Sequence, residues 1–156
     1  MQPVPYMLEA LNLAREGMER GDGGPFGAVI VRDGQVIGRG CNKVLRTNDP
    51  TAHAEIVAIR DACSRTGSYW LENAHIYVNC EPCPMCLAAL YWAKIKYLTF
   101  GASRDDAAKI DFDDAYIYQE TCRPVEERSL ITNQCGREKA LKIMQLWSTF
   151  NQKQQY

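Results

Sequence analysis

Two short motifs, thirty residues apart, most constrain how this chain can fold. His53-Ala54-Glu55 offers an imidazole and a carboxylate, and Cys83-Pro84-Met85-Cys86 offers two thiols. His53, Cys83 and Cys86 are three potential metal ligands, one fewer than the four that close a structural zinc site. A catalytic zinc needs that fourth position for a water molecule. A fold that uses these residues together must bring both motifs to one place.

Glu55 is better suited to moving protons than to binding the metal. Residues i and i+2 on a helix do not share a face, so His53 and Glu55 can meet one ion only at a first turn, from different sides. Two thiolates and an imidazole cancel the charge of zinc, and we infer that such a site acidifies its water less than three histidines would. We therefore expect Glu55 to take a proton from the water and deliver it to the leaving group.

The bulk composition favours one ordinary globular domain. The 156 residues are 46% hydrophobic and 24% charged, and the formal net charge of −1 does not favour a polyanion as the main partner. Met1 to Arg20 lacks the apolar core of a signal peptide, and no 18-residue apolar run occurs, so we expect a cytoplasmic protein. Seven cysteines without a secretory context are more typical of thiols and metal ligands than of disulfides.

Hydrophobic periodicity predicts a hairpin followed by alternating helices and strands, hence a mixed sheet covered by helices on both faces. Asp33-Gly34 is a two-residue hairpin turn, and Asp49-Pro50 predicts a helix start with Asp49 as N-cap. The pattern weakens from Ala102 to Glu120. The expected strands are Phe26–Val31, Gln35–Gly40, His75–Cys80 and Ile95–Gly101, and the expected helices are Tyr6–Arg20, Asp49 to about Arg65, Pro82–Pro84 through Tyr91, and Glu138–Phe150.

Other interpretations of the cysteines stay open at this point. Cys83 and Cys86 alone could be buried thiols or a structural zinc knuckle, or part of a non-catalytic zinc module that binds a base or a partner. Cys80-x-x-Cys83-x-x-Cys86 hints at an iron–sulfur cluster, but the bacterial ferredoxin run needs a fourth cysteine where this chain has Leu90. The nearby Glu55 favours the catalytic zinc site over each of these.

On these motifs the chain resembles the cytidine-deaminase-like superfamily and, within it, the guanine deaminases of bacteria. The H-x-E…P-C-x-x-C pattern is the signature of zinc-dependent nucleobase deaminases and by itself indicates only a deaminase. Phe112-Asp-Asp114 and the terminal Tyr156 favour guanine. The resemblance spans nearly the whole chain and rests on Gly24–Val31, Asn48–Glu55, Cys80–Cys86 followed by Tyr91–Ala93, Phe112–Asp114 and Lys153–Tyr156.

The resemblance implies a three-layer α/β/α fold with a mixed five-stranded sheet, and a single deaminase domain over 1–156. It implies a homodimer in which the segment from about 138 to 156 is exchanged between subunits. One zinc per subunit would be held by His53, Cys83 and Cys86. Glu55 and Asp114 would act in catalysis, Asn42 and Asp114 would bind the purine edge, Phe26 and Trp92 would form apolar or stacking walls, and Tyr156 would be a lid residue.

The function implied is the hydrolytic deamination of guanine to xanthine and ammonia by zinc-activated water, with Glu55 as the proton carrier. The alternative in the same superfamily is a tRNA adenosine deaminase, which would need a basic surface that this slightly acidic chain does not favour. Another nucleobase or aminopurine is a further alternative, and a non-catalytic zinc module is the least favoured. From the residues alone, the tail ending at Tyr156 also fits a frayed terminus, and the aspartates near Asp114 fit a solvated loop.

Overall fold

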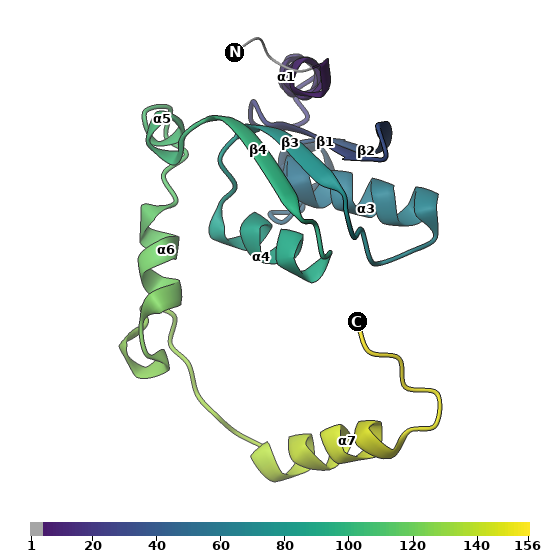
Figure 1. The fold of residues 1–156 in the computed structure, drawn as a ribbon. Coiled ribbons are helices and arrows are strands. Elements are labelled where there is room, and N and C mark those ends of the chain that lie inside the picture. The colour runs from purple at the N-terminus through teal and green to yellow at the C-terminus, as the bar shows by residue number, and fades with distance from the viewer. Residues whose placement is uncertain (1–4) are drawn as a thin grey trace. The chain divides into compact units, whose positions relative to one another are not determined.

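The structure, a computed structural model, describes residues 5–156 as two compact units. The first unit runs to Asp114 and the second covers Ala115–Tyr156. The first unit holds the sheet and the helices that pack on it (Figure 1). Its elements are α1 (Pro5–Glu19), β1 (Gly27–Arg32), β2 (Gln35–Cys41), α2 (Val44–Thr47), α3 (Ala54–Thr66), β3 (His75–Cys80), α4 (Pro84–Trp92), β4 (Tyr97–Ala102) and α5 (Arg104–Ala108).

The sheet is mixed, with strand order β2-β1-β3-β4. β1 pairs antiparallel with both β2 and β3, and β3 pairs parallel with β4. The predicted hairpin turn is confirmed, since Asp33 and Gly34 have φ values of 52° and 76°, as a type I′ turn requires. All four strands that the residues predicted are present.

The five-stranded sheet implied by the resemblance is wrong, because residues 5–156 form a four-stranded sheet. After β4 the chain enters α5, and the polar stretch that follows has no apolar alternation with which to extend the sheet. The described residues beyond α5 instead form α6 (Ala115–Cys122), a 3₁₀ turn η1 (Val125–Glu127) and α7 (Arg137–Thr149).

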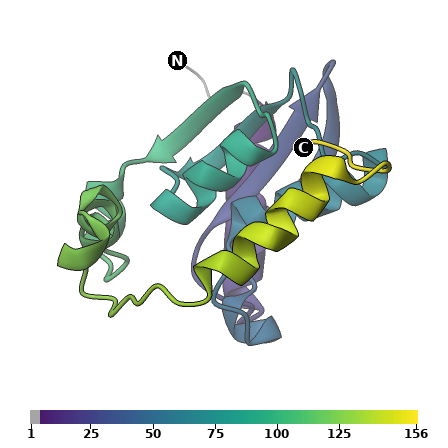
Figure 2. The same cartoon turned by 90° about the horizontal axis from the view of Figure 1, so that it is seen from below.

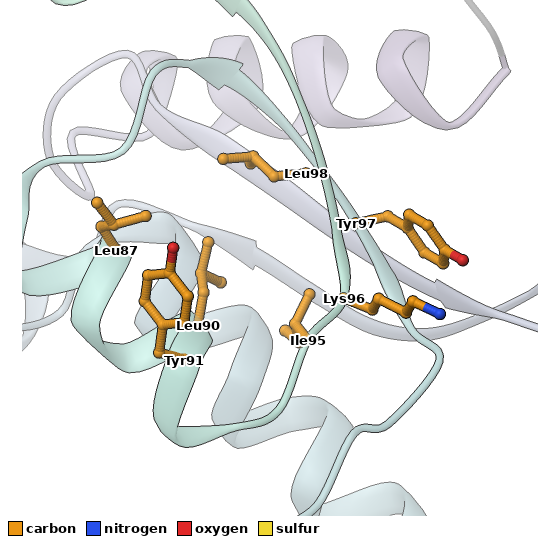
Figure 3. Close-up of a pocket in the computed structure, with 7 residues that line it drawn as sticks. All are labelled: Leu87, Leu90, Tyr91, Ile95, Lys96, Tyr97 and Leu98. Atoms are coloured by element: carbon orange, nitrogen blue, oxygen red, sulfur yellow. The ribbon is translucent and has the colours of Figure 1, made fainter.

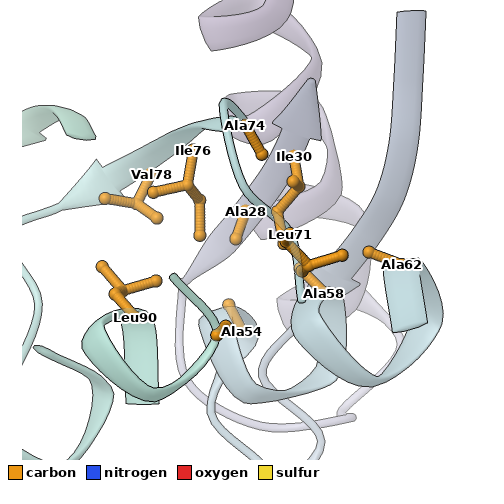
Figure 4. Packing of buried hydrophobic residues seen from close by; sticks show 11 residues of the cluster. Ala28, Ile30, Ala54, Ala58, Ala62, Leu71, Ala74, Ile76, Val78 and Leu90 are labelled. Atoms are coloured by element: carbon orange, nitrogen blue, oxygen red, sulfur yellow. The ribbon is translucent and has the colours of Figure 1, made fainter. Parts of the chain in front are cut away.

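Helices cover both faces of the sheet, so the α/β/α layering is confirmed for the first unit. α1 packs on one face, where Ala10 meets Val29 and Val31 of β1. α3 and α4 pack on the other face, seen from below in Figure 2. There Ala28 and Ile30 of β1 point with Ile76 and Val78 of β3 toward the alanines of α3 and Leu90 of α4 (Figure 4). Successive residues of β1 therefore serve opposite layers, as strand geometry requires.

Glycines in β2 allow α3 to approach the sheet closely. A Cβ on Gly40 would lie 2.2 Å from the backbone oxygen of Ala54, and one on Gly38 would lie 2.5 Å from that of Ala58. Both contacts are with helix backbone, which cannot rotate away as a side chain can. β2 therefore fixes the position of the first turns of α3, where His53 and Glu55 are placed.

The predicted N-cap of the second long helix is wrong. α3 begins at Ala54, and its N-cap is His53, whose backbone is extended. Asp49 instead closes a local turn, since its Oδ1 accepts hydrogen bonds from the N–H and hydroxyl of Thr51 at 2.8 and 2.7 Å. Aspartate satisfies such a turn as readily as a helix start, and here the turn prevails.

The second unit is a helical segment. Glu120 links α6 to the segment that follows it. The Glu120 carboxylate forms an ion pair with Arg123 at 2.7 Å and accepts a hydrogen bond from the backbone N–H of Ser129 at 2.7 Å. On α7, the ring of Trp147 stacks on that of Phe150 with 6.1 Å between centroids. The amphipathic helix predicted over 138–150 is confirmed at 137–149.

Among residues 5–156, no helix has the length and apolar character needed to cross a membrane.

Candidate active site

The two sequence motifs meet at the N-termini of two neighbouring helices. His53 is the N-cap of α3 and Cys83 is the N-cap of α4, with Pro84 at the first helical position and Cys86 in the first turn. Proline suits that first position because its missing N–H would have had no partner in the helix. Helix N-termini favour thiolates, so α4 presents Cys83 and Cys86 where the helix dipole stabilises their negative charge.

The ligand atoms have the spacing that a tetrahedral zinc needs. Nδ1 of His53 lies 3.6 Å from Sγ of Cys83 and 3.5 Å from Sγ of Cys86, and all three atoms lie within 4.8 Å of one another. Zinc–nitrogen and zinc–sulfur bonds of ordinary length separate such ligands by roughly 3.6 Å at the tetrahedral angle. The three residues thus fit zinc and leave one coordination position open.

The thiols are electrostatically suited to this task. The pKa of the Cys83 thiol is lowered to about 4, chiefly by hydrogen bonding with Cys86 and then by the imidazole of His53. The pKa of Cys86 is raised because it keeps the proton shared with Cys83, and burial adds to this. Hydrogen bonding with Cys83 also raises the pKa of His53. Metal binding replaces the shared proton with a cation.

Glu55 lies beside the ligands without being one of them. It occupies the first turn of α3, is 7% exposed and reaches hydrogen-bonding range of Cys86. Burial raises the pKa of its carboxyl group, with the negative charge of Cys83 acting in the same direction. A buried carboxyl group of raised pKa next to an open coordination position is equipped to accept and return a proton.

Three further predicted residues belong to the first unit near this centre. Phe26 packs against the core cluster on the α3–α4 face, and its ring meets that of Phe112 edge-on at 4.8 Å between centroids. Asn42 is buried, and its Oδ1 accepts a hydrogen bond from the Val44 N–H at 3.1 Å. Asp114 lies near enough to Cys83 for their charges to interact.

Two opposing influences act on the carboxyl group of Asp114. Burial raises the pKa of its carboxyl group, while the guanidinium of Arg104, 4.0 Å away at the closest approach of Nε to Oδ1, opposes the rise. Arg104 is anchored in turn, since its backbone N–H donates to Oε2 of Glu81 at 3.1 Å. A carboxylate held in this way can accept hydrogen bonds from a ligand.

Trp92 and Tyr156 are not brought to the centre by the first unit. Trp92 ends α4, about 13 Å along the helix from Cys83, and is 66% exposed. Tyr156 belongs to the second unit. Their predicted roles as wall and lid stay predictions.

Sequence reasoning missed two residues that support the site, Arg104 and Asn79. Arg104 lies in the stretch of weak periodicity, and only its charge could have marked it as a partner for an aspartate. Asn79 interrupts the apolar strand His75–Cys80, and a polar side chain in such a strand is a signal for a buried hydrogen-bond role.

A separate hollow lies between α4 and β4 and contains none of these residues. It is lined by Leu87, Leu90 and Tyr91 of α4 and by residues 95–98 (Figure 3). β4 is an edge strand, and Tyr97 and Phe100 on it are 50% and 43% exposed. This is an apolar surface at the open edge of the sheet.

Comparison with known proteins places this fold and site in a family. The model of the cytidine and deoxycytidylate deaminase zinc-binding region matches residues 2–102. The chain belongs to this family, and His53, Cys83 and Cys86 are the residues that could form its zinc site.

Within the family, the chain is a homologue of a guanine deaminase. It is 48% identical to guanine deaminase from Bacillus subtilis over 156 residues, which is 100% of both chains. The crystal structure of guanine deaminase from that organism matches with a TM-score of 0.95 and 47% identity, covering 100% of this chain and 99% of that one. A tRNA-specific adenosine deaminase from Agrobacterium fabrum is 44% identical over 117 residues, 75% of this chain and 76% of the relative.

Proposed function

We propose that this protein is a zinc-dependent guanine deaminase that converts guanine and water to xanthine and ammonia. The observation that carries the proposal is the full-length likeness to guanine deaminase from Bacillus subtilis, at 48% identity and without truncation of either chain. The likeness to the tRNA-specific adenosine deaminase of Agrobacterium fabrum covers 75% of this chain. The formal net charge of −1 also supports a small uncharged substrate over RNA.

Zinc held by His53, Cys83 and Cys86 would supply a Lewis acid that polarises a water molecule at the open coordination position. Glu55 would take one proton of this water as the oxygen adds to C2 of guanine, and would pass it to the ring nitrogen. It would then take the remaining proton from the added oxygen and pass it to the amino group at C2, so that the bond from C2 to the exocyclic nitrogen breaks, ammonia leaves and the C2 carbonyl of xanthine forms. Burial raises the pKa of Glu55, which makes its carboxylate a better proton acceptor than an exposed one.

The remaining predicted residues would select and orient the base. Guanine presents N–H donors at positions 1 and 2, and Asp114 as a carboxylate offers only acceptors. The amide of Asn42 would contact the purine edge, and Phe26 would form an apolar wall. Trp92, at the far end of α4 from Cys83, and Tyr156 would reach a site as wall and lid only through a partner subunit.

We further propose that the protein works as a homodimer with its C-terminal segment, from about residue 138, exchanged between subunits. The apolar hollow between α4 and β4 supports a protein partner at the edge of the sheet. Trp92 and Tyr91, 66% and 71% exposed at the end of α4, extend the same apolar surface. A second subunit there would cover them.

Ammonia release from a panel of substrates tests the proposed function. The zinc-loaded protein is incubated separately with guanine, guanosine, cytosine, adenine and a tRNA anticodon stem-loop. We expect rapid release from guanine alone. Ammonia release from the stem-loop and not from guanine would reject guanine in favour of tRNA adenosine. No ammonia from any of the five substrates, with zinc bound, would reject both the guanine and the tRNA adenosine activity.

A further inference from the structure

Asn79, near the end of β3, makes two hydrogen bonds to the backbone on either side of Phe26. Its Oδ1 accepts from the N–H of Gly27 and its Nδ2 donates to the carbonyl oxygen of Pro25, both at 2.8 Å. These bonds join residues 52 and 54 positions apart in the sequence. One side chain therefore clamps the chain before and after Phe26.

The hydrogen bonds of the Asn79 side chain continue the link between β1 and β3 beyond the end of their backbone pairing. The pairing of β1 with β3 ends at Ala28 opposite Val78, so no strand neighbour serves the backbone of Gly27 from the β3 side. The Asn79 amide supplies both an acceptor and a donor there, as a strand would. The backbone of Phe26 has other partners. The Phe26 N–H donates to the carbonyl oxygen of Gly24 at 2.8 Å, and the Phe26 carbonyl oxygen accepts from the N–H of Asn42 at 2.9 Å.

Asn79 acts from the opposite side of the sheet to the candidate site. Ile76 and Val78 of β3 belong to the core on the α3–α4 face, and Tyr77 packs against the cluster under α1. By strand alternation Asn79 shares the face of Tyr77, whereas Phe26 packs with the α3–α4 core. A base bound between Phe26 and the metal ligands would touch Phe26 and not Asn79.

The same strand leads to the metal ligands. Cys80 follows Asn79 directly, and Cys83, the N-cap of α4, lies three residues after Cys80. Asn79 therefore links the backbone of a substrate wall to the element that delivers the thiolates. Among the described side-chain hydrogen bonds of Pro25 and Gly27, those from Asn79 join them to β3, and they extend the link beyond the last backbone pair of Ala28 with Val78.

We propose that Asn79 is a positioning residue for substrate binding, which sets the distance from the Phe26 wall to the metal centre. This inference rests on the proposed function, because Phe26 matters only if a base is bound beside it. A wall that contacts the ground state and the transition state equally affects KM and leaves kcat nearly unchanged.

Steady-state kinetics of Asn79 variants on guanine test this. Asn79→Ala removes both hydrogen bonds. Asn79→Asp keeps the shape and the acceptor for Gly27 but loses the donor to Pro25, and this variant replaces Asn79→Ala if the alanine variant fails to fold. We expect KM to rise roughly tenfold in Asn79→Ala and kcat to stay within about twofold. Thr99→Val is the matched control, since it removes the 2.8 Å bond to His75 at the other end of the β3–β4 pair.

A double-mutant cycle with Phe26→Leu separates positioning from a general structural effect. If Asn79 acts through Phe26, Asn79→Ala raises KM less than about twofold in the Phe26→Leu background. An equal rise in both backgrounds, an unchanged KM, or a loss of kcat alone would overturn the inference.

Guanine binding to Glu55→Gln, measured by calorimetry with and without Asn79→Ala, distinguishes the two proposals. Binding unaffected by Asn79→Ala rejects only the positioning role. No binding at all, together with no ammonia from the wild-type protein, rejects the guanine function.

Discussion

At the scale of single residues, Glu55 is the group on which the proposed chemistry depends. It is the buried carboxyl group beside the three ligand atoms, and burial raises its pKa. Glu55→Gln keeps the shape and removes the proton carrier. We predict that kcat falls by about 10²–10⁴ while the zinc content is unchanged. Metal analysis and ammonia release on one preparation check this, with the exposed Glu72→Gln as control; normal turnover by Glu55→Gln would contradict it.

The three ligands are distinguished from the neighbouring Cys80 by geometry. Sγ of Cys86 lies 3.5 Å from Nδ1 of His53, whereas the Cys80 thiol points to the carbonyl of Ser103 at 3.9 Å. Cys86→Ser should therefore purify with well under one zinc per chain, and Cys80→Ser with about one, because a serine hydroxyl is a poor substitute for a thiolate. Equal zinc loss in the two variants would contradict the assignment of ligands.

The sequence predicts which residues come together where they belong to a local motif. The His53 and Cys83–Cys86 motifs each stand at a helix start, so a short window of sequence is enough to find them. Asn79 and Arg104 were not predicted, because neither shares a local motif with its partner. The partner of Asn79 is the backbone of Gly27, and the partner of Arg104 is the carboxylate of Asp114. Only the packing of β1 beside β3, or of α5 near Asp114, brings such partners together.

At the scale of elements, close packing of β2 on α3 holds the first turn of α3 in place. A Cβ on Gly40 would meet the backbone of Ala54 at 2.2 Å and of Ala58 at 2.5 Å. We predict that Gly40→Ala destabilises the fold by about 2 kcal/mol, because α3 must move away from the sheet. Urea denaturation measures this as a lower midpoint.

The matched control is Gly67, the C-cap of the same helix. It has φ = 63° and open space around it, and asparagine tolerates this conformation. Gly67→Asn should cost well under half as much as Gly40→Ala. A Gly40→Ala protein as stable as the wild type would mean that α3 does not depend on this contact.

The strands were predictable because their apolar runs are bounded by turn residues. The hairpin, β3 and β4 all follow from such runs, and Asp33-Gly34 marks the turn. The start of α3 was mispredicted because Asp49 can serve a local turn or a helix equally well. α5 and α6, with 5 and 8 residues, are too short for helical periodicity to emerge. The fifth strand came from the resemblance and not from the residues.

At the scale of the whole molecule, the proposed exchange of C-terminal segments implies that two subunits share each site. If Tyr156 completes the site of the partner subunit, two differently damaged chains can complement each other. Coexpressing Glu55→Gln with a chain lacking residues 150–156 should restore about a quarter of wild-type activity, since half of the dimers are mixed and each contains one intact site.

The control pairs Glu55→Gln with Cys86→Ser, two lesions within the first unit, and should restore nothing. If coexpression of Glu55→Gln with the truncated chain gives no more activity than the two variants give separately, each site uses the C-terminus of its own subunit. Sedimentation analysis of the mixed sample verifies that dimers are present.

A hydrolytic deaminase must place an oxygen atom from water on C2 of guanine. The most direct measurement is mass spectrometry of the product formed from guanine by the zinc-loaded protein in H₂¹⁸O. We predict xanthine carrying one ¹⁸O for each ammonia released, with formation nearly abolished in Glu55→Gln. Xanthine without the label, or no xanthine while a tRNA anticodon stem-loop is deaminated, would contradict the hydrolytic deamination of guanine.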